Sequence, residues 1–243
     1  MVLYNLKIMR QQVWTVGSRY MSPTRQLLKA GEVASSIKTF KNIISKGGEL
    51  VLVNSLDLVD EAAEIITPVF IDLNNKSVYG GIFAESNGQM LEGNTDSYVF
   101  WVKEGGELTI EGDGDIIAQE AIYSMAVWAN GGNVIIKGGR FYNNGEGSDL
   151  IYASAGGNVY IYGGEFHPCQ KQPGTQGTAD EYVALNIKDA DYKSGISKIV
   201  VYGGKFYGFN PANNKSEGPN TNFVADGYKS VEIEPNVWEV IKE

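Results

Sequence analysis

The clearest pattern in the sequence is a run of alternating apolar and polar residues that occurs twice, in residues 131–141 and 156–166. The copies read GGNVIIKGGRF and GGNVYIYGGEF, and matching positions are 25 residues apart. Alternate side chains of an extended strand point to the same side, which places Val134, Ile136, Val159 and Ile161 together. We therefore predict short β-strands that bury these four side chains.

Weaker copies flank the repeated pair, at residues 105–116 and 196–206, and less regular ones lie at 47–53 and 69–83. A second apolar segment recurs before each copy, at 99–102, 125–128, 150–153, 183–187 and 223–225. A period near 25 residues, with Gly and Asn at the corners, is typical of a solenoid built from stacked strands. The predicted fold class is all-β: a right-handed parallel β-helix with an N-terminal arm and a short capping helix.

The repeat also predicts columns of equivalent residues on successive coils. Phe83, Phe141, Phe166 and Phe206 are expected to stack in the core, and Asn133 and Asn158 at a corner. The position before each phenylalanine is occupied by Ile82, Arg140, Glu165 and Lys205, which predicts a ladder of alternating charge.

The outward positions of the same strands are unusually apolar. We expect Ile135, Tyr160, Tyr162, Val200 and Tyr202 to form a strip on the surface. Such strips mark contacts, and three kinds are open here: a sister subunit, sugar rings stacked on tyrosine, or cover by the N-terminal arm or the 167–181 insertion.

The two ends of the chain differ from the repeats. Residues 31–46 space apolar side chains at helical intervals, so a short helix is expected to cap the first coil. Val231, Ile233, Val237, Trp238 and Val240 are expected to close the last coil, where Pro235 stops further pairing. We divide the chain into an arm with its capping helix (1–46) and the β-helix with its C-terminal cap (47–243).

The net charge of −9 conceals a strong asymmetry. Residues 1–46 hold eight Lys/Arg and one acid, a charge of +7, whereas residues 47–243 hold 12 bases and 28 acids, a charge of −16. A basic segment with aromatic residues predicts an anchor for an acidic partner, through Arg10, Trp14, Arg19, Tyr20 and Arg25. The alternative is that the arm packs along its own solenoid. The acidic body argues against nucleic-acid binding, and neither a signal peptide nor a membrane-spanning run is expected.

Catalytic chemistry has few candidate residues. A β-helix that cleaves polysaccharides needs paired carboxylates, or acids that hold calcium beside a base. The candidates are Glu165, Asp180, Glu181 and His167, around the insertion, and none belongs to a recognisable motif. Asp189 and Asp191 are expected in a turn, and Asp113 and Asp115 at a corner. His167 with Cys169 is too sparse for a metal site, so we expect neither metal nor cofactor.

The segment from SIKTFKNIISKGGELVLVNSLDL to ITPVFIDLNNKSVYGG, together with FWVKEGGELTIEGDGDI and GGNVIIKGGRF, resembles the pectate-lyase-like β-helix superfamily as it occurs in phage fibres and spikes and in bacterial surface proteins. The resemblance covers residues 47–210. It implies a right-handed solenoid, commonly a homotrimer, that binds or cleaves surface glycans. No catalytic signature of the lyases matches residue by residue.

The sequence therefore favours a virion structural protein without enzymatic activity, either a head fibre or a tail-spike-like appendage. Residues 1–46 would attach it to capsid or tail proteins, and the β-helix would decorate the virion surface or adhere to host glycans. The alternatives are a polysaccharide lyase or glycoside hydrolase of the β-helix type, and a bacterial surface adhesin.

Overall fold

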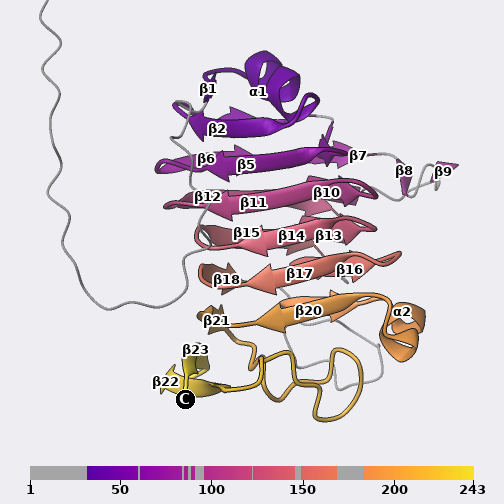
Figure 1. Ribbon diagram of the computed structural model, residues 1–243, viewed down its shortest axis with the longest axis vertical. Helices are drawn as coiled ribbons and strands as arrows, with labels where there is room; N and C mark the ends of the chain where they lie inside the picture. Colours follow the sequence, from indigo (N-terminus) through magenta and orange to yellow (C-terminus); the bar gives the residue numbers. More distant parts are fainter. Residues whose placement is uncertain are drawn as a thin grey trace, which may run out of the picture. The chain divides into compact units, whose positions relative to one another are not determined.

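The computed structural model describes residues 32–59, 61–83, 85–86, 89–90, 96–121, 123–145, 149–168 and 183–243. Gly31–Glu243 forms one compact unit, and its described residues lie mostly in parallel β-strands of stacked sheets (Figure 1). The prediction of an all-β chain is confirmed.

Three sheets account for nearly all the strands. Sheet A contains, in spatial order, β1 (Glu32–Ala34), β2 (Gly48–Leu52), β5 (Pro68–Asp72), β11 (Glu107–Glu111), β14 (Asn133–Ile136), β17 (Asn158–Ile161) and β20 (Lys198–Val201). Sheet B contains β22 (Tyr228–Glu234), β23 (Val237–Lys242), β21 (Gly204–Tyr207), β18 (Glu165–His167), β15 (Arg140–Gly145), β12 (Gly114–Ala121), β6 (Lys76–Tyr79) and β3 (Leu56–Asp57). Sheet C contains β19 (Leu185–Ile187), β16 (Ile151–Ser154), β13 (Tyr123–Asn130), β10 (Asp96–Lys103) and β4 (Ala63–Ile65), with β7 (Gly81–Phe83) antiparallel to β10. A separate hairpin pairs β8 (Glu85–Ser86) with β9 (Gln89–Met90).

From β10 to β21 the chain visits the sheets in a fixed rotation, from C to A to B and back to C. Each circuit adds one parallel strand to every sheet, and the strands of sheet A lie one below another (Figure 1). The arrangement is compatible with a solenoid. The repeat in the sequence indicated at least two strands per period, and the structure has three.

The predicted inward side chains of sheet A form two buried columns. Ile110, Ile136, Ile161 and Val201 are paired in register and are fully buried. Leu108, Val134, Val159 and Ile199 form the second column, and none exceeds 5% exposure. The predicted alternation between inward and outward residues is therefore confirmed, and these columns join the core of the unit.

The phenylalanine column is confirmed in part. Phe141, Phe166 and Phe206 are fully buried, and their rings stack with centroids 5.0 and 4.6 Å apart. Phe83 is not the fourth member, because β7 turns back antiparallel to β10 and Ile116 takes the place beside Phe141. The asparagine column is confirmed, since Asn158 Nδ2 donates to Asn133 Oδ1 over 3.1 Å.

Close backbone contact explains the glycines at the corner between sheets C and A. A Cβ atom on Gly132 would lie 2.5 Å from the carbonyl oxygen of Lys103, and one on Gly157 would lie 2.1 Å from that of Ala129. Only glycine fits where one coil passes this close to the next. The Gly-Gly pairs in the repeat therefore allow the corner to follow the close spacing that the strand ladders impose.

Each end of the stack carries a different cap. The helix predicted within residues 31–46 is α1 (Ile37–Ile44), which begins at a Ser36/Thr39 capping box and buries Phe40, Ile43 and Ile44. It is shorter than expected, because Glu32–Ala34 form β1 at the edge of sheet A and Val33 is exposed. At the other end β22 and β23 form an antiparallel hairpin against β21. Val240 is buried there as expected, but Ile233 is 42% exposed, so its predicted place in the core is wrong.

Two predicted turns have a different structure. Asp189 and Asp191 lie in α2 (Asp189–Ser194), a short helix that ends at Gly195 in the left-handed conformation, rather than in a turn between strands. Of the two acids predicted at a corner, Asp113 does lie in the bend between β11 and β12, whereas Asp115 lies in β12. Among the described residues, neither helix is long and apolar enough to cross a membrane.

Candidate functional site

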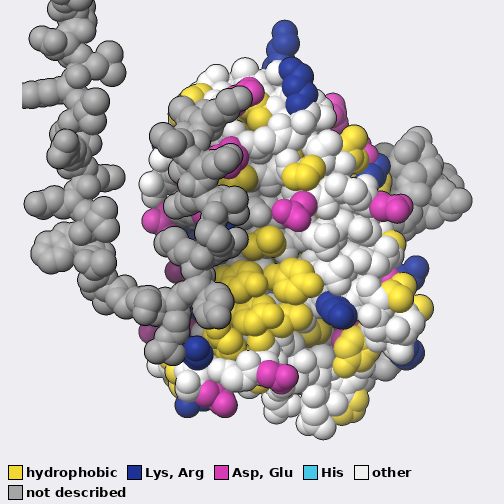
Figure 2. Space-filling model, viewed as in Figure 1, with side chains coloured by type: hydrophobic (Ala, Val, Ile, Leu, Met, Phe, Trp, Pro, Cys, Tyr) yellow, Lys and Arg dark blue, Asp and Glu magenta, His cyan; other side chains and the backbone are white. Residues whose placement is uncertain are grey.

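The predicted apolar strip lies on the outer face of sheet A. Ile135, Tyr160 and Val200 occupy one register column of β14, β17 and β20, and all three are half-buried. Tyr162 and Tyr202 follow the ends of β17 and β20 and form a second column. Hydrophobic side chains gather on this face over β14, β17 and β20 (Figure 2). All five predicted strip residues are thus brought together on one surface.

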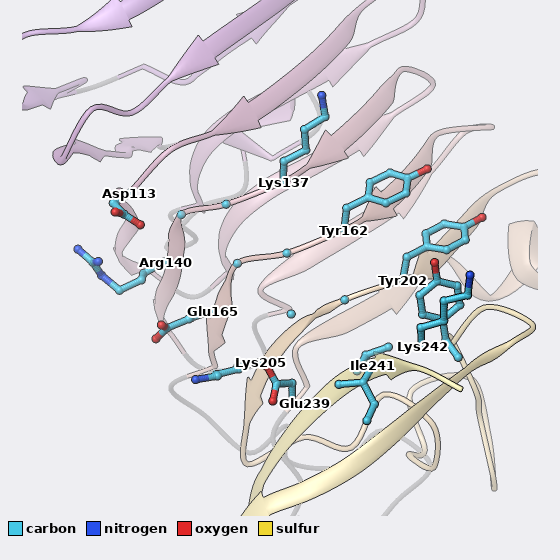
Figure 3. Close-up of a pocket in the computed structure, with 18 residues that line it drawn as sticks. Asp113, Lys137, Arg140, Tyr162, Glu165, Tyr202, Lys205, Glu239, Ile241 and Lys242 are labelled. Carbon is cyan, nitrogen blue, oxygen red and sulfur yellow. The ribbon is translucent and has the colours of Figure 1, made fainter. Parts of the chain in front are cut away.

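A groove of about 680 Å³ runs beside the second column, at the corner between sheets A and B. Its lining comes from three successive Gly-Gly corners, from the side chains that flank them, and from the terminal hairpin (Figure 3). The flanking residues are Asp113, Lys137, Arg140, Tyr162, Glu165, Tyr202 and Lys205, and the hairpin contributes Tyr228, Glu239, Val240, Ile241 and Lys242.

The floor of the groove is glycine backbone. A Cβ atom on Gly163 would lie 2.7 Å from the carbonyl oxygen of Lys137, and one on Gly203 would lie 2.5 Å from that of Tyr162. These positions stay free of side chains because the coils approach too closely for any other residue. A ligand in the groove can therefore approach the backbone between the two walls.

One wall consists of stacked tyrosines. The rings of Tyr162 and Tyr202 have centroids 4.8 Å apart and planes within 6° of parallel, and Tyr228 meets Tyr202 edge-on at 5.4 Å. Partial burial, followed by the nearby phenols, raises the pKa of Tyr162 above its ordinary value. Its hydroxyl is therefore protonated at neutral pH and can donate a hydrogen bond.

The opposite wall is the predicted charge ladder, with one correction. The register aligns Asp115, Arg140, Glu165, Lys205 and Glu239 on successive strands of sheet B. Asp115 stands in the place predicted for Ile82, which lies in β7 and pairs with Ser97. Arg140 Nε lies 2.6 Å from Asp115 Oδ1, and this hydrogen bond raises the pKa of Arg140 despite an opposing effect of burial. The charges of Asp115 and Arg140, the first two residues of the ladder, therefore neutralise each other.

Glu165 and His167 are close together in β18, two residues apart along the strand. His167 stacks between Tyr142 and Tyr207, with centroids 4.7 and 4.0 Å away, and burial lowers its pKa. Glu165 Oε2 accepts a hydrogen bond from Tyr207 Oη at 3.3 Å and lies 3.5 Å from His167 Nε2. The latter separation exceeds an ordinary hydrogen bond, and His167 Nε2 is buried without a hydrogen-bond partner among the described residues. An aromatic column therefore holds both candidate catalytic residues in place.

The other predicted site residues fall outside the described part of the chain. These are the carboxylates Asp180 and Glu181, the neighbouring Cys169, and the anchoring residues Arg10, Trp14, Arg19, Tyr20 and Arg25. No cluster of three or more His, Cys, Asp or Glu side chains suited to a metal ion occurs among the residues that are described.

The structure also contains two acids with raised pKa values that the sequence did not indicate, of which Asp149 is buried and Glu217 is half-buried. Asp149 is 7% exposed, accepts a hydrogen bond from Asn186 at 2.9 Å, and has a pKa raised to about 7 by burial. Burial likewise raises the pKa of Glu217 to about 7, while its Oε1 accepts the backbone N–H of Ile187 in the edge strand of sheet C. Glu217 lies in a segment without repeats, so no periodic signal could have placed it.

A stacked tryptophan pair on sheet C was also missed. The rings of Trp101 and Trp128 lie 5.3 Å apart and within 8° of parallel, and the Lys103 ammonium sits 3.8 Å above Trp101. The VFWV and MAVW segments each contain a tryptophan, but at the third and the fourth letter, so their alignment by the repeat does not match the structural register, which pairs Trp101 with Trp128.

No protein-family model matches this chain, and neither the curated proteins nor the solved structures include a match.

Proposed function

We propose that the chain is a right-handed parallel β-helix related to the pectate-lyase-like superfamily. The rotation through three parallel sheets supports this proposal, as do the stacked Asn133 and Asn158 at one corner and the stacked phenylalanines in the core. Ladders of identical residues are a common result when each coil repeats the path of the one before it.

We further propose that it is a virion appendage without enzymatic activity, which displays this β-helix to adhere to host surface glycans. The observation that carries the proposal is the tyrosine wall beside a groove with a backbone floor. Aromatic rings next to a backbone floor and charged side chains can offer a sugar both its apolar and its polar contacts. Glu165, the described catalytic candidate in the groove, already contacts Tyr207 and His167.

Attachment to the particle is assigned to residues 1–46, through capsid or tail proteins. Their charge of +7 contrasts with −16 for the remainder of the chain. The basic segment favours binding to an acidic protein surface. The acidic remainder of the chain would be repelled by the same surface. The two parts of the chain therefore suit different partners.

The test combines location with activity. Antibodies raised against the chain are expected to label intact virions by immunogold electron microscopy, and the purified chain should release no reducing ends or unsaturated sugars from the surface polysaccharide of the host cells. Unlabelled virions would rule out the appendage. Release of sugars that Glu165→Gln abolishes would replace adhesion with the alternative of a polysaccharide-cleaving enzyme.

A second prediction concerns assembly, for which we propose a homotrimer held by the central column of the strip. The full-length chain is expected to have a native mass of three times 26.5 kDa by light scattering. Tyr160→Ser should lower the trimer fraction because it removes a half-buried aromatic contact at the centre of the face, while Tyr192→Ser on α2 serves as the exposed control. A monomeric wild-type chain, or equal trimer fractions for both variants, would contradict this assignment.

A further inference from the structure

A loop at residues 210–222 lies beyond β20, at the C-terminal end of the stacked sheets (Figure 1). We propose that this loop is a pH-sensitive latch. Glu217 holds it on the edge of sheet C while the carboxyl group is neutral, and the loop is released when Glu217 and Asp149 ionise. The inference goes beyond the proposed function, because it concerns the end of the stack and not a ligand site.

The loop is a structural unit between two anchors. Phe209 and Phe223, on either side of it, are buried in the core, and Phe223 O accepts the N–H of Val201 in β20 at 2.8 Å. Inside the loop, Asn214 and Thr221 exchange backbone hydrogen bonds at 3.1 and 2.9 Å, and the buried Asn214 side chain also donates to Thr221 O. The loop can therefore move as one piece while both of its ends stay fixed.

Glu217 joins the loop to the edge of sheet C. β19 is the last strand of that sheet, and the N–H of Ile187 in this strand donates to Glu217 Oε1. The other carboxyl oxygen, Oε2, is buried and has no hydrogen-bond partner within the described part of the chain. Burial of an unpaired charge costs far more free energy than burial of a neutral polar group. The closed position of the loop therefore favours a protonated Glu217.

A second carboxyl group, that of Asp149, lies beside the same strand. Asp149 is buried just before β16, and its Oδ2 accepts a hydrogen bond at 2.9 Å from Asn186 Nδ2, next to Ile187 in β19. Burial raises the pKa of Asp149 to about 7, although the hydrogen bond from Asn186 opposes this shift. Tyr152 in β16 stays neutral, because burial and then the charges of Asp149 and Asp191 raise its pKa.

The charges that act on Glu217 come from α2 and from Asp149. Burial raises the pKa of Glu217 most, and the hydrogen bond from Ile187 opposes it. The negative charges of Asp189 and Asp149 raise this pKa further, while Lys193 lowers it. Lys193 also forms an ion pair with Asp189 at 3.7 Å, so α2 brings charges of both signs toward the latch.

Rising pH therefore favours the open latch. The pKa of Glu217 is about 7 in the closed loop, and we expect its ordinary value of 4.5 once the loop opens and the carboxyl group meets water. The closed state is then fully favoured below about pH 4 and loses this advantage as pH rises to about 7, by up to about tenfold per pH unit. Once Asp149 also ionises, its charge repels that of Glu217.

The experiment measures local opening in the full-length chain by hydrogen–deuterium exchange and mass spectrometry, at several pH values between about 5 and about 8. Each rate is divided by the intrinsic exchange rate at that pH, which gives an opening constant. Peptides that cover the latch and Ile187 are expected to open about tenfold more, or more than that, at the upper pH than at the lower. A peptide that covers β17 in the middle of sheet A is the reference for global unfolding, and its opening constant should change less.

Three variants assign the effect to Glu217. Glu217→Gln keeps an oxygen acceptor for Ile187 and removes the charge, so the latch should stay closed at every pH tested. Glu217→Ala removes the acceptor and should raise the opening constant about tenfold even at the lower pH. Asp226→Asn is the matched control, because Asp226 is exposed and lies outside the latch. A wild-type latch whose opening does not depend on pH would overturn the proposal, as would a pH dependence that Glu217→Gln leaves unchanged, or an equal rise in the β17 peptide.

Discussion

Ile136→Asp is expected to unfold the stacked sheets, whereas the same substitution at the adjacent Ile135 leaves them folded. Ile136 is fully buried between Ile110 and Ile161, so an aspartate there would place an unpaired carboxylate in the core. The cost, about 4 kcal/mol or more, is comparable to the whole stability of many domains. Ile135 is half-buried on the outer face, where a carboxylate keeps its water, and the expected cost is about 1 kcal/mol.

The pair is a matched experiment, since the residue type, the substitution and the strand are the same. Thermal unfolding followed by circular dichroism, together with the soluble yield, measures the difference. Similar melting temperatures for the two variants would mean that the alternation along β14 is not the one described.

Asp149→Asn is expected to remove much of the pH dependence of stability. Burial raises the pKa of Asp149 from 3.8 to about 7, so the folded state retains a proton that the unfolded chain releases above about pH 4. The wild-type free energy of unfolding should therefore fall as pH rises from about 4 to about 7, by up to about 4 kcal/mol from this residue. Above pH 7 the Asn variant, which carries no charge to bury, should be the more stable protein.

Urea unfolding at several pH values between about 4 and about 8 tests this expectation. Glu217→Gln should reduce the same slope, because burial raises the pKa of Glu217 in the same direction. Asp226→Asn is the control, since Asp226 is exposed in the turn before β22. Wild-type stability that rises between pH 5 and pH 7 would contradict the assignment of Asp149 as the dominant group.

The parts of the fold that repeat could be predicted, and the parts that break the repeat could not. The buried columns follow from the alternation of apolar and polar residues within each repeat. The corner glycines, such as Gly157, also recur in each repeat, so one period of the sequence contains the information for both features. Gly80 to Phe83 resembles the ends of the true repeats, yet β7 pairs antiparallel with β10. Because the sequence aligned this segment with the true repeats, it wrongly predicted Ile82 and Phe83 at the ladder positions that Asp115 and Ile116 occupy.

The candidate site divides in the same way. The repeat predicted the tyrosine column of Tyr162 and Tyr202. It also predicted the charge ladder of Arg140, Glu165 and Lys205. The end of the groove is built by Tyr228, Ile241 and Lys242 in the terminal hairpin. Their positions depend on an antiparallel hairpin outside the repeat, so the repeating pattern could not reveal that wall.

The same hairpin has a consequence for solubility. A stack of parallel strands ends in an edge that can accept another molecule, which is the usual route to fibres. In sheet B that edge is covered by β23 and then β22, which runs antiparallel to β23 and exposes Lys229, Glu232 and Glu234. Charged residues on an edge strand oppose pairing with a neighbour. Many copies can therefore be crowded together without sheet B propagating from one molecule into the next.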